Sequence, residues 1–338
     1  MLAKELIQCQ QRAITQSKVA DPFIFSPQMV RELQLLPFAR CVLRWAARLK
    51  PALPRAVGGR PIIYAEEGVL VTIMVMTVWQ VSPEALVKRM QRWPELALAC
   101  GYEPGQVISA SQLRRRRDNL GLWVYAITFC SLVFLLIRRG VLLGRDWVID
   151  STIIDAFSRH DSAAGWSFSK RFGYKVHLLM CRDSLLPILL LVSPANANDA
   201  PWGRRLLRLA HFLFVLPVAV VRADAAYFTR AILSLIVKTL KATPKVVYNP
   251  RKAGKKTPVT LEWVAHYRQD RGKRGYIERL FAVLKRYYRL NDLHSMGLRA
   301  AYRHAFEVCL GVLLVACLAH HVGRPDLIHA RSRLLAPC

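Results

Sequence analysis

The segment DWVIDSTII, at residues 146–154, decides the fold because the hydrophobic pattern of the chain changes there. From this segment on, short runs rich in Val, Ile and Leu are separated by polar or glycine-containing turns, which is typical of strands. Two further runs follow, YKVHLLM at 174–180 and LPILLLV at 186–192. The sequence therefore predicts three strands in succession.

Helices and strands alternate after these three strands. The expected elements are a helix at 199–212, a strand at 218–224 (VAVVRAD), a helix at 227–240, a strand at 245–249 (KVVYN) and a last helix from about Tyr276 to Leu290. Asp199 is expected to cap the first of these helices. The predicted order is β-β-β-α-β-α-β-α, that of an α/β domain.

The region before Asp146 is predicted to be mostly helical. Ser82 followed by a proline is a helix start. A short helix, QLRRRRDN, is expected at 112–119 with Ser109 or Ser111 as its cap, and a long buried helix follows it. The predicted domains are a helical region at 1–145, an α/β domain at 146–320 and a C-terminal tail at 321–338.

The net charge indicates a polyanionic partner. Fifty Lys and Arg against 22 Asp and Glu give a charge of +28 in 338 residues. A basic surface of this size attracts phosphates and releases their counterions. Nucleic acid is therefore the expected partner, ahead of an anionic membrane surface.

The apolar content of 53% raises the alternative of a membrane protein. The longest apolar runs, at 123–137, 69–81 and 308–319, are shorter than the ~18–20 residues that cross a bilayer. The N-terminus lacks the apolar segment of a signal peptide. The eight cysteines form no C-x-x-C pair, which argues against a zinc module or a disulfide framework. We therefore expect a cytoplasmic, nucleoid-associated protein without membrane contact.

Three acidic residues form the candidate catalytic and metal site. Asp150 and Asp224 each end an apolar run, so their carboxylates should project from the tips of strands, and Glu278 lies on the last helix. Mg²⁺ prefers such oxygen ligands, and two ions can hold the attacking and leaving oxygens of a phosphodiester exchange. Two rival acids have simpler roles, since Asp155 is expected to cap a turn and Asp199 to cap a helix.

The last helix combines this carboxylate with cations. Its buried stripe is expected to consist of Ile277, Leu280, Phe281, Leu284 and Tyr288. Glu278, Lys285 and Arg289 lie on another face, within about 60° of one another at ~100° per residue. This arrangement suits a metal ion beside a DNA backbone. The alternative is a surface helix with ordinary salt bridges.

Basic residues elsewhere are candidate DNA contacts. The segment 251–290 carries a charge of +9, from twelve Lys or Arg against three acids, with tyrosines between them. In the run Arg114–Arg117 at most two side chains can face bases, and Arg114 and Arg115 are the candidates; contact with phosphates is the alternative. Lys175 and His177 are expected to lie on the same face of their strand. They are either phosphate contacts or half-exposed strand residues without a role in binding.

The last helix resembles a signature of bacterial insertion-sequence DDE transposases of the IS-four and IS-five type. Arg274, Glu278 and Lys285 match the R-x3-E-x6-K part of the YREK signature, but position 271, where that signature has Tyr, is Arg. Tyr267 is nearby but out of register. The run from Glu278 to Phe281, which contains Arg279, resembles the sister group with R-x-x-x-E-R-x-F followed by Lys.

Four more segments resemble the same family in the same order: VIDST around Asp150, G-Y-K-V-H at 173–177, P-A-N-A-N-D at 194–199 and RADAAY around Asp224. The likeness covers 146–320 well and 60–120 more weakly, where such proteins have a helical DNA-end-binding region. The element order also resembles that of ribonuclease-H-like nucleotidyl transferases, which implies a mixed five-stranded sheet.

The resemblance implies a transposase that binds terminal inverted repeats, cleaves DNA at the element's ends and transfers the 3′-hydroxyl to target DNA. Asp150, Asp224 and Glu278 would hold two Mg²⁺, with Mn²⁺ as a substitute. Double-stranded DNA would be the partner, and pairing of two ends implies a homodimer. The alternatives are a transposase-derived protein that binds DNA without catalysis and a structure-specific nuclease on the same fold.

Overall fold

The structure is a computed structural model that describes residues 25–49, 64–247 and 275–336. The chain divides into two compact units, Met1–Leu132 with Glu307–Cys338, and Val133–Phe306. These units differ from the predicted division at 145/146 and 320/321, because two long helices each run from one unit into the other.

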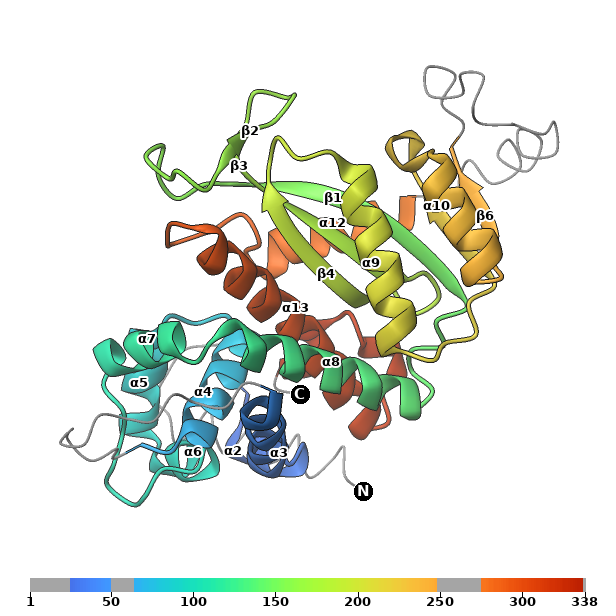
Figure 1. Cartoon of the computed structure of the whole chain (residues 1–338). Helices are drawn as coiled ribbons and strands as arrows, with labels where there is room; N and C mark the ends of the chain where they lie inside the picture. Colours follow the sequence, from blue (N-terminus) through green and yellow to red (C-terminus); the bar gives the residue numbers. More distant parts are fainter. Residues whose placement is uncertain (1–24, 50–63, 248–274, 337–338) are drawn as a thin grey trace. The chain divides into compact units, whose positions relative to one another are not determined.

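The second unit contains a mixed sheet of six strands (Figure 1). The strands are β1 (Asp146–Asp155), β2 (Gly165–Trp166), β3 (Phe172–Cys181), β4 (Leu186–Pro194), β5 (Val220–Ala223) and β6 (Thr243–Val246). Their spatial order is β4-β3-β1-β5-β6, with β2 paired to the start of β3. The two-residue β2 is the strand that the prediction of five did not include.

Strand direction changes in the middle of this sheet. β1 pairs antiparallel with β3, and β3 antiparallel with β4, whereas β1–β5 and β5–β6 are parallel. Helices α9 (Asp199–Leu213) and α10 (Arg230–Ser234) supply the crossovers, and α12 (Gly275–Tyr287) follows β6 along the chain. Apart from β2, the described elements follow one another in the predicted order β-β-β-α-β-α-β-α, and residues 248–274, between β6 and α12, lie outside the description.

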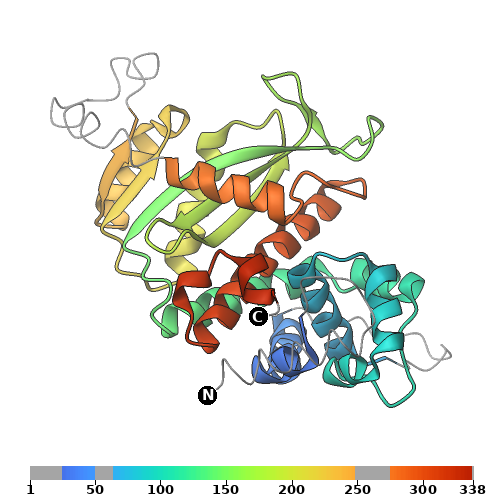
Figure 2. The same ribbon diagram turned by 180° about the vertical axis from the view of Figure 1, so that it is seen from behind.

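Helices cover the sheet on both faces. α9 contacts β3, β4 and β1, and α12 packs along β1. Figure 1 shows α9 in front of the sheet, and Figure 2, seen from behind, shows α12 in front of it. The predicted apolar stripe of α12 is buried, with Ile277, Leu280, Phe281 and Leu284 at most 7% exposed. α12 is therefore held against the sheet by its apolar side.

Several predicted boundaries in this unit were wrong. The helix expected at 227–240 begins at Arg230, because Thr229 caps it, and continues as a π-helical turn, Leu235–Thr239. The fifth strand lies at Thr243–Val246 rather than 245–249. The last helix ends at Tyr287 rather than Leu290.

The first unit is helical in its described part, as predicted. Its helices are α2 (Pro27–Glu32), α3 (Leu35–Leu49), α4 (Glu66–Trp79), α5 (Pro83–Arg92), α6 (Pro94–Ala99), α7 (Ala110–Asn119) and the start of α8 (Leu122–Arg138), then the end of α13 (Leu298–His321), a 3-10 turn at Pro325–Leu327 and α14 (Arg331–Leu335). Ser82 caps α5, and Ser109 caps α7 in a capping box with Gln112.

One described helix, α13, has the length and composition to cross a membrane, with a mean hydropathy of 1.6 over an 18-residue window. The expectation that no segment is long enough was therefore wrong, because the apolar run at 308–319 lies within a helix of 24 residues. Two bent pairs, α4 with α5 and α7 with α8, would each meet the same test if counted as one span. Of the α13 window, 89% is buried inside the structure.

Candidate active site

Asp150 and Asp224 lie side by side at the centre of the sheet. In the parallel pair β1–β5, Val148 is in register with Arg222 and Ile149 with Ala223. Asp150 lies within β1, five residues before its end rather than at the predicted strand tip, and Asp224 follows directly after β5. Continuing the same register by one position places the two residues opposite each other. Neighbouring strands are about 4.8 Å apart, which places the two carboxylates on adjacent backbones.

These two carboxylates point to the face of the sheet on which α12 packs. Side chains alternate between the faces of a strand. Ile149 faces α9, because its side chain lies close to Gly203 of that helix. Asp150 therefore points to the opposite face, and so does Asp224, since residues in register on parallel strands share a face.

Backbone amides fix one oxygen of each carboxylate. Asp150 Oδ1 accepts a hydrogen bond from the Ser151 amide at 2.8 Å, and Asp224 Oδ1 accepts one from the Ala226 amide at 2.8 Å. The second bond caps a 3-10 turn, Ala225–Tyr227, that begins where β5 ends. Local geometry thus orients both side chains.

Glu278 lies in the first turn of α12 and is exposed. Among the residues with described positions, no three His, Cys, Asp or Glu side chains are grouped closely enough to hold a metal ion. The structure thus brings Asp150 and Asp224 together and leaves Glu278 outside a preformed group of three. Three carboxylates repel one another when close together, which is a physical reason for this arrangement.

Tyr227 is a component of this region that the sequence reasoning did not assign. Its ring is 1% exposed and packs close to Gly203. Burial raises the pKa of the Tyr227 phenol well above its usual value, and the charges of Asp150, Asp199 and Asp224 raise it further. Tyr227 is therefore a neutral, buried side chain near three carboxylates. Its position in the sequence, three residues after Asp224 in the segment RADAAY, could have indicated that Tyr227 lies near the site.

Asp199 does not cap α9, because it is the first helical residue and Asn198 occupies the cap position. Its carboxylate instead accepts a hydrogen bond from Ser151 Oγ at 2.7 Å and lies 3.1 Å from Lys175 Nζ. Lys175 also donates to the Ala197 carbonyl at 2.9 Å. A partly buried polar network therefore joins β1, β3 and the start of α9 on the face opposite Asp150.

His177 belongs to the same network. It is in register with Ser151, its side chain is fully buried, its Nε2 lies 2.9 Å from Ser193 Oγ, and its ring stacks on Trp202. Burial lowers the pKa of His177 to about 4, although Asp199 opposes this. A buried, neutral imidazole has no surface for phosphate. The structure thus contradicts the DNA contact predicted for His177 and gives Lys175 a structural partner in Asp199.

Asp155, the rival of Asp150, is an ion-pair partner rather than a turn cap. It ends β1 and accepts two hydrogen bonds from Arg171, both at 2.9 Å. Lys285 lies near this pair: burial and the charge of Arg171 lower the pKa of its ammonium group, and Asp155 opposes them. α12 therefore brings Lys285 to the end of the strand that carries Asp150.

The other cations predicted around α12 have different positions. Arg279 is exposed, and its guanidinium lies 5.2 Å from the Tyr276 ring centre. Arg289 was expected to share a helix face with Glu278, but it lies beyond the end of α12, has φ of 58° and pairs with Asp292 at 2.7 Å. Arg274, with the expected signature positions 267 and 271, falls outside the described residues.

Helix α7 divides the arginine run into two pairs. Arg114 and Arg115 are exposed, and Arg114 forms an ion pair with Glu84. Arg117 instead forms a two-bond pair with Glu307, which is 5% exposed, and this carboxylate raises the pKa of Arg117 despite its burial. Arg116 donates to the Tyr64 carbonyl at 3.3 Å. Arg114 and Arg115, the two candidates for base contact, are thus the exposed members of the run, and that contact stays a prediction.

Comparison with known proteins identifies the class to which this site belongs. The model of the transposase DDE domain family matches residues 144–314, just over half of the chain. The matched segment contains β1 with Asp150, β5 with Asp224 after it, and α12 with Glu278. A search of curated proteins finds no match.

Two solved structures are similar to parts of the chain. The piggyBac transposase synaptic complex with hairpin DNA is 11% identical, with a TM-score of 0.43 over 92% of this chain and 79% of that one. The Mos1 transposase paired-end complex with left transposon end is 14% identical, with a TM-score of 0.22 over 72% of this chain and 85% of that one. Both scores are too low to support an argument of their own.

The chain belongs to the transposase DDE domain family. Membership implies an enzyme that cleaves and joins DNA, and such enzymes generally use divalent metal ions.

Proposed function

We propose that the chain is the transposase of a bacterial insertion sequence, which binds the element's terminal inverted repeats, cleaves DNA at its ends and transfers the 3′-hydroxyl to target DNA. The observation that carries this proposal is the position of Asp150 and Asp224, next to each other on parallel strands and on the face where α12 packs. Ribonuclease-H-like architecture, with β4-β3-β1-β5-β6 as its strand order, is part of the same proposal.

The donor set fits a hard divalent cation. Mg²⁺ is usually held by one or two carboxylates together with substrate phosphates, and Asp150 and Asp224 supply such a pair. Glu278 is the third proposed ligand, from the exposed side of α12. When bound, two Mg²⁺, or Mn²⁺ in their place, would lower the pKa of the attacking hydroxyl and stabilise the leaving oxygen.

The chain's own residues position the substrate. Asp150 and Asp224 are each oriented by a backbone amide, so one carboxylate oxygen has a fixed direction. Lys285, near the end of β1, and the exposed Arg279 are proposed to contact phosphates beside the carboxylates, and Arg274 and Arg289 to extend that contact. Arg114 and Arg115 on α7 are proposed as DNA contacts of the first unit.

The finer assignments belong to the same proposal. The IS-four and IS-five type follows from the resemblance around Glu278, with Arg at the position of the signature's Tyr. A homodimer on two DNA ends, a cytoplasmic, nucleoid-associated location and the absence of membrane contact follow from that function. The proposed domain roles are DNA-end binding for 1–145 and catalysis for 146–320, followed by the tail at 321–338.

The test is cleavage of DNA that carries the inverted repeats flanking the coding sequence. We expect Asp150→Asn and Asp224→Asn each to reduce Mg²⁺-dependent cleavage at least about 100-fold, since loss of a metal ligand removes several kcal/mol of transition-state stabilisation. Glu278→Gln should do the same. The control is Asp183→Asn, which removes an exposed carboxylate from the turn between β3 and β4.

Three results would contradict the proposal. Cleavage by the Asp150 and Asp224 variants at the wild-type rate would show that these carboxylates do not hold the reacting ions. A wild-type chain that binds the repeats but never nicks them with Mg²⁺ or Mn²⁺ would instead indicate a DNA-binding protein without catalysis. Cleavage without joining of the 3′-hydroxyl to a target would indicate a nuclease.

A further inference from the structure

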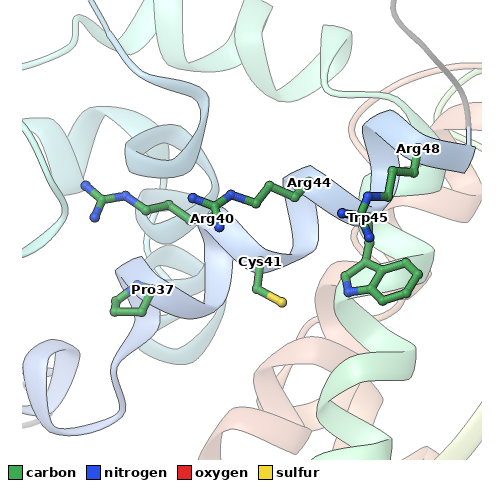
Figure 3. A pocket seen from close by; sticks show the side chains of 6 residues that line it. All are labelled: Pro37, Arg40, Cys41, Arg44, Trp45 and Arg48. Atoms are coloured by element: carbon green, nitrogen blue, oxygen red, sulfur yellow. The ribbon is translucent and has the colours of Figure 1, made fainter.

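The exposed side of α3 forms a pocket rich in arginine. The lining residues all come from this helix: Pro37, Arg40, Cys41, Arg44, Trp45 and Arg48. Figure 3 shows Arg40 and Arg44 extending in the same direction along α3, with Arg48 beside the Trp45 ring. We call these six residues the basic face of α3.

The other side of the helix is fixed in the first unit. Leu35, Ala39, Val42 and Ala46 are each at most 7% exposed, and α3 packs against α4. Because this apolar side is buried, the basic face is turned to solvent.

The arginines are spaced to follow a row of phosphates. Arg40, Arg44 and Arg48 are four residues apart, so at 1.5 Å per residue they follow one another at about 6 Å and span about 12 Å. Phosphates of one DNA strand succeed each other every ~3.4 Å along the helix axis. The distance from Arg40 to Arg48 therefore corresponds to about three to four phosphate spacings along the DNA axis.

Trp45 adds an aromatic surface to these charges. Its side chain is 53% exposed, and the Arg48 guanidinium lies 5.4 Å from its ring centre. Exposed aromatic rings between cations are typical of nucleic-acid contacts, where the ring packs on sugars and bases while the cations hold phosphates. Arg40 also bonds Glu67 at 3.3 Å, so Arg44 and Arg48 are the better test of the charges.

An anionic membrane surface is the main competitor as an occupant. A helix that lies in a membrane interface inserts its apolar side among the lipids and keeps its cations on the polar side. In α3 the apolar side is packed inside the protein. The basic face therefore has the charge to bind phosphates but no apolar side free to enter a membrane, which favours DNA over lipid as its partner.

We propose that the basic face of α3 binds the DNA backbone, with Arg44 and Arg48 on phosphates about two positions apart on one strand and Trp45 against the adjacent sugar and base. This inference rests on the proposed function, which makes DNA the substrate, and adds a contact surface that is independent of the carboxylate site.

The experiment measures duplex binding by the full chain in EDTA, so that cleavage does not contribute. Fluorescence anisotropy with a labelled duplex, repeated from low to high salt, gives the dissociation constant and its salt dependence. For Arg44→Gln/Arg48→Gln we expect the slope of log K against log salt to fall by about 2, and binding at 0.1 M salt to weaken about tenfold or more. Trp45→Ala should weaken binding by about fivefold or more, with most of the affinity retained in Trp45→Phe.

The matched control is Arg204→Gln/Arg208→Gln, which removes two exposed charges from α9. Equal effects of the two double variants would overturn the inference, because general charge would then explain the binding. An unchanged salt slope for Arg44→Gln/Arg48→Gln would also overturn it. So would a loss of binding to phosphatidylserine vesicles that equals or exceeds the loss for DNA.

The two proposals fail in different ways. DNA binding that depends on Arg44 and Arg48 in a chain that cannot cleave would refute the proposed chemistry and support the inference. Normal cleavage and unaltered DNA binding in the Arg44→Gln/Arg48→Gln variant would support the proposed chemistry and refute the inference about α3. All substituted side chains are exposed, and an unchanged circular dichroism spectrum and melting temperature would show that each variant is folded.

Discussion

Replacing Asp199 by Asn removes the charge that balances Lys175 inside the second unit. The two groups lie 3.1 Å apart with only 13% and 22% of their side chains exposed. Breaking a buried pair leaves one charge uncompensated and typically costs about 3–5 kcal/mol. With this partial exposure we expect a loss of about 2–3 kcal/mol, or roughly 4–12 °C in melting temperature for a unit of this size.

The double variant Lys175→Met/Asp199→Asn separates the ion pair from other effects. It removes both charges, so it should recover most of the stability lost in Asp199→Asn, while the amide oxygen of the introduced side chain can still accept the hydrogen bond from Ser151. The assay is urea unfolding of the wild type, both single variants and the double variant as a double-mutant cycle. If Asp199→Asn lies within about 0.5 kcal/mol of the wild type, the ion pair does not stabilise the fold.

Three further predictions concern packing and charge. Gly203→Ala should destabilise the second unit by about 1–3 kcal/mol, measured by urea unfolding, because its Cβ would lie 2.5 Å from the Tyr227 ring; a neutral effect would show that the ring moves freely. His177 binds its proton more weakly in the folded chain, with a pKa of about 4 against 6.5 in the unfolded chain. The free energy of unfolding should therefore fall by up to about 3 kcal/mol as the pH drops from 6.5 towards 4, and the His177→Phe variant should lack this dependence. Glu307→Gln should lower the melting temperature of the first unit by roughly 5 °C or more, because Arg117 would lose its charged partner; an unchanged melting curve would contradict this.

The local pattern of the sequence predicted most of the elements in the second unit. Runs of Val, Ile and Leu located β1, β3 and β4 within two residues at each end, because side-chain alternation and turn residues act over short distances. The predicted ends of some helices were wrong. Thr229 delays the start of α10, and α12 stops at Tyr287, so that Arg289 leaves the helix face it was expected to share.

In the candidate site, too, features set by residues close in sequence were predicted, and those set by residues far apart in sequence were not. Asp150 and Asp224 were found from the sequence because each ends an apolar run. Lys175 and His177 were correctly predicted to share a face, but which face depended on the pairing of β1 with β3. Asp199 was mistaken for a cap, since its true partners, Ser151 and Lys175, are 48 and 24 residues away along the chain.

By itself, the amino-acid sequence determined most of the strands and helices and the two acids that end apolar runs, since these depend on residues a few positions apart. It did not determine that β1 continues past Asp150 to Asp155. Only the tertiary structure decided that Asp150 and Asp224 are neighbours, that Asp199 joins a partly buried network on the opposite face, and that Glu278 stays outside a preformed group of three. Those outcomes depend on strand register and helix packing between segments separated by tens of residues, where the folded chain as a whole sets the distances.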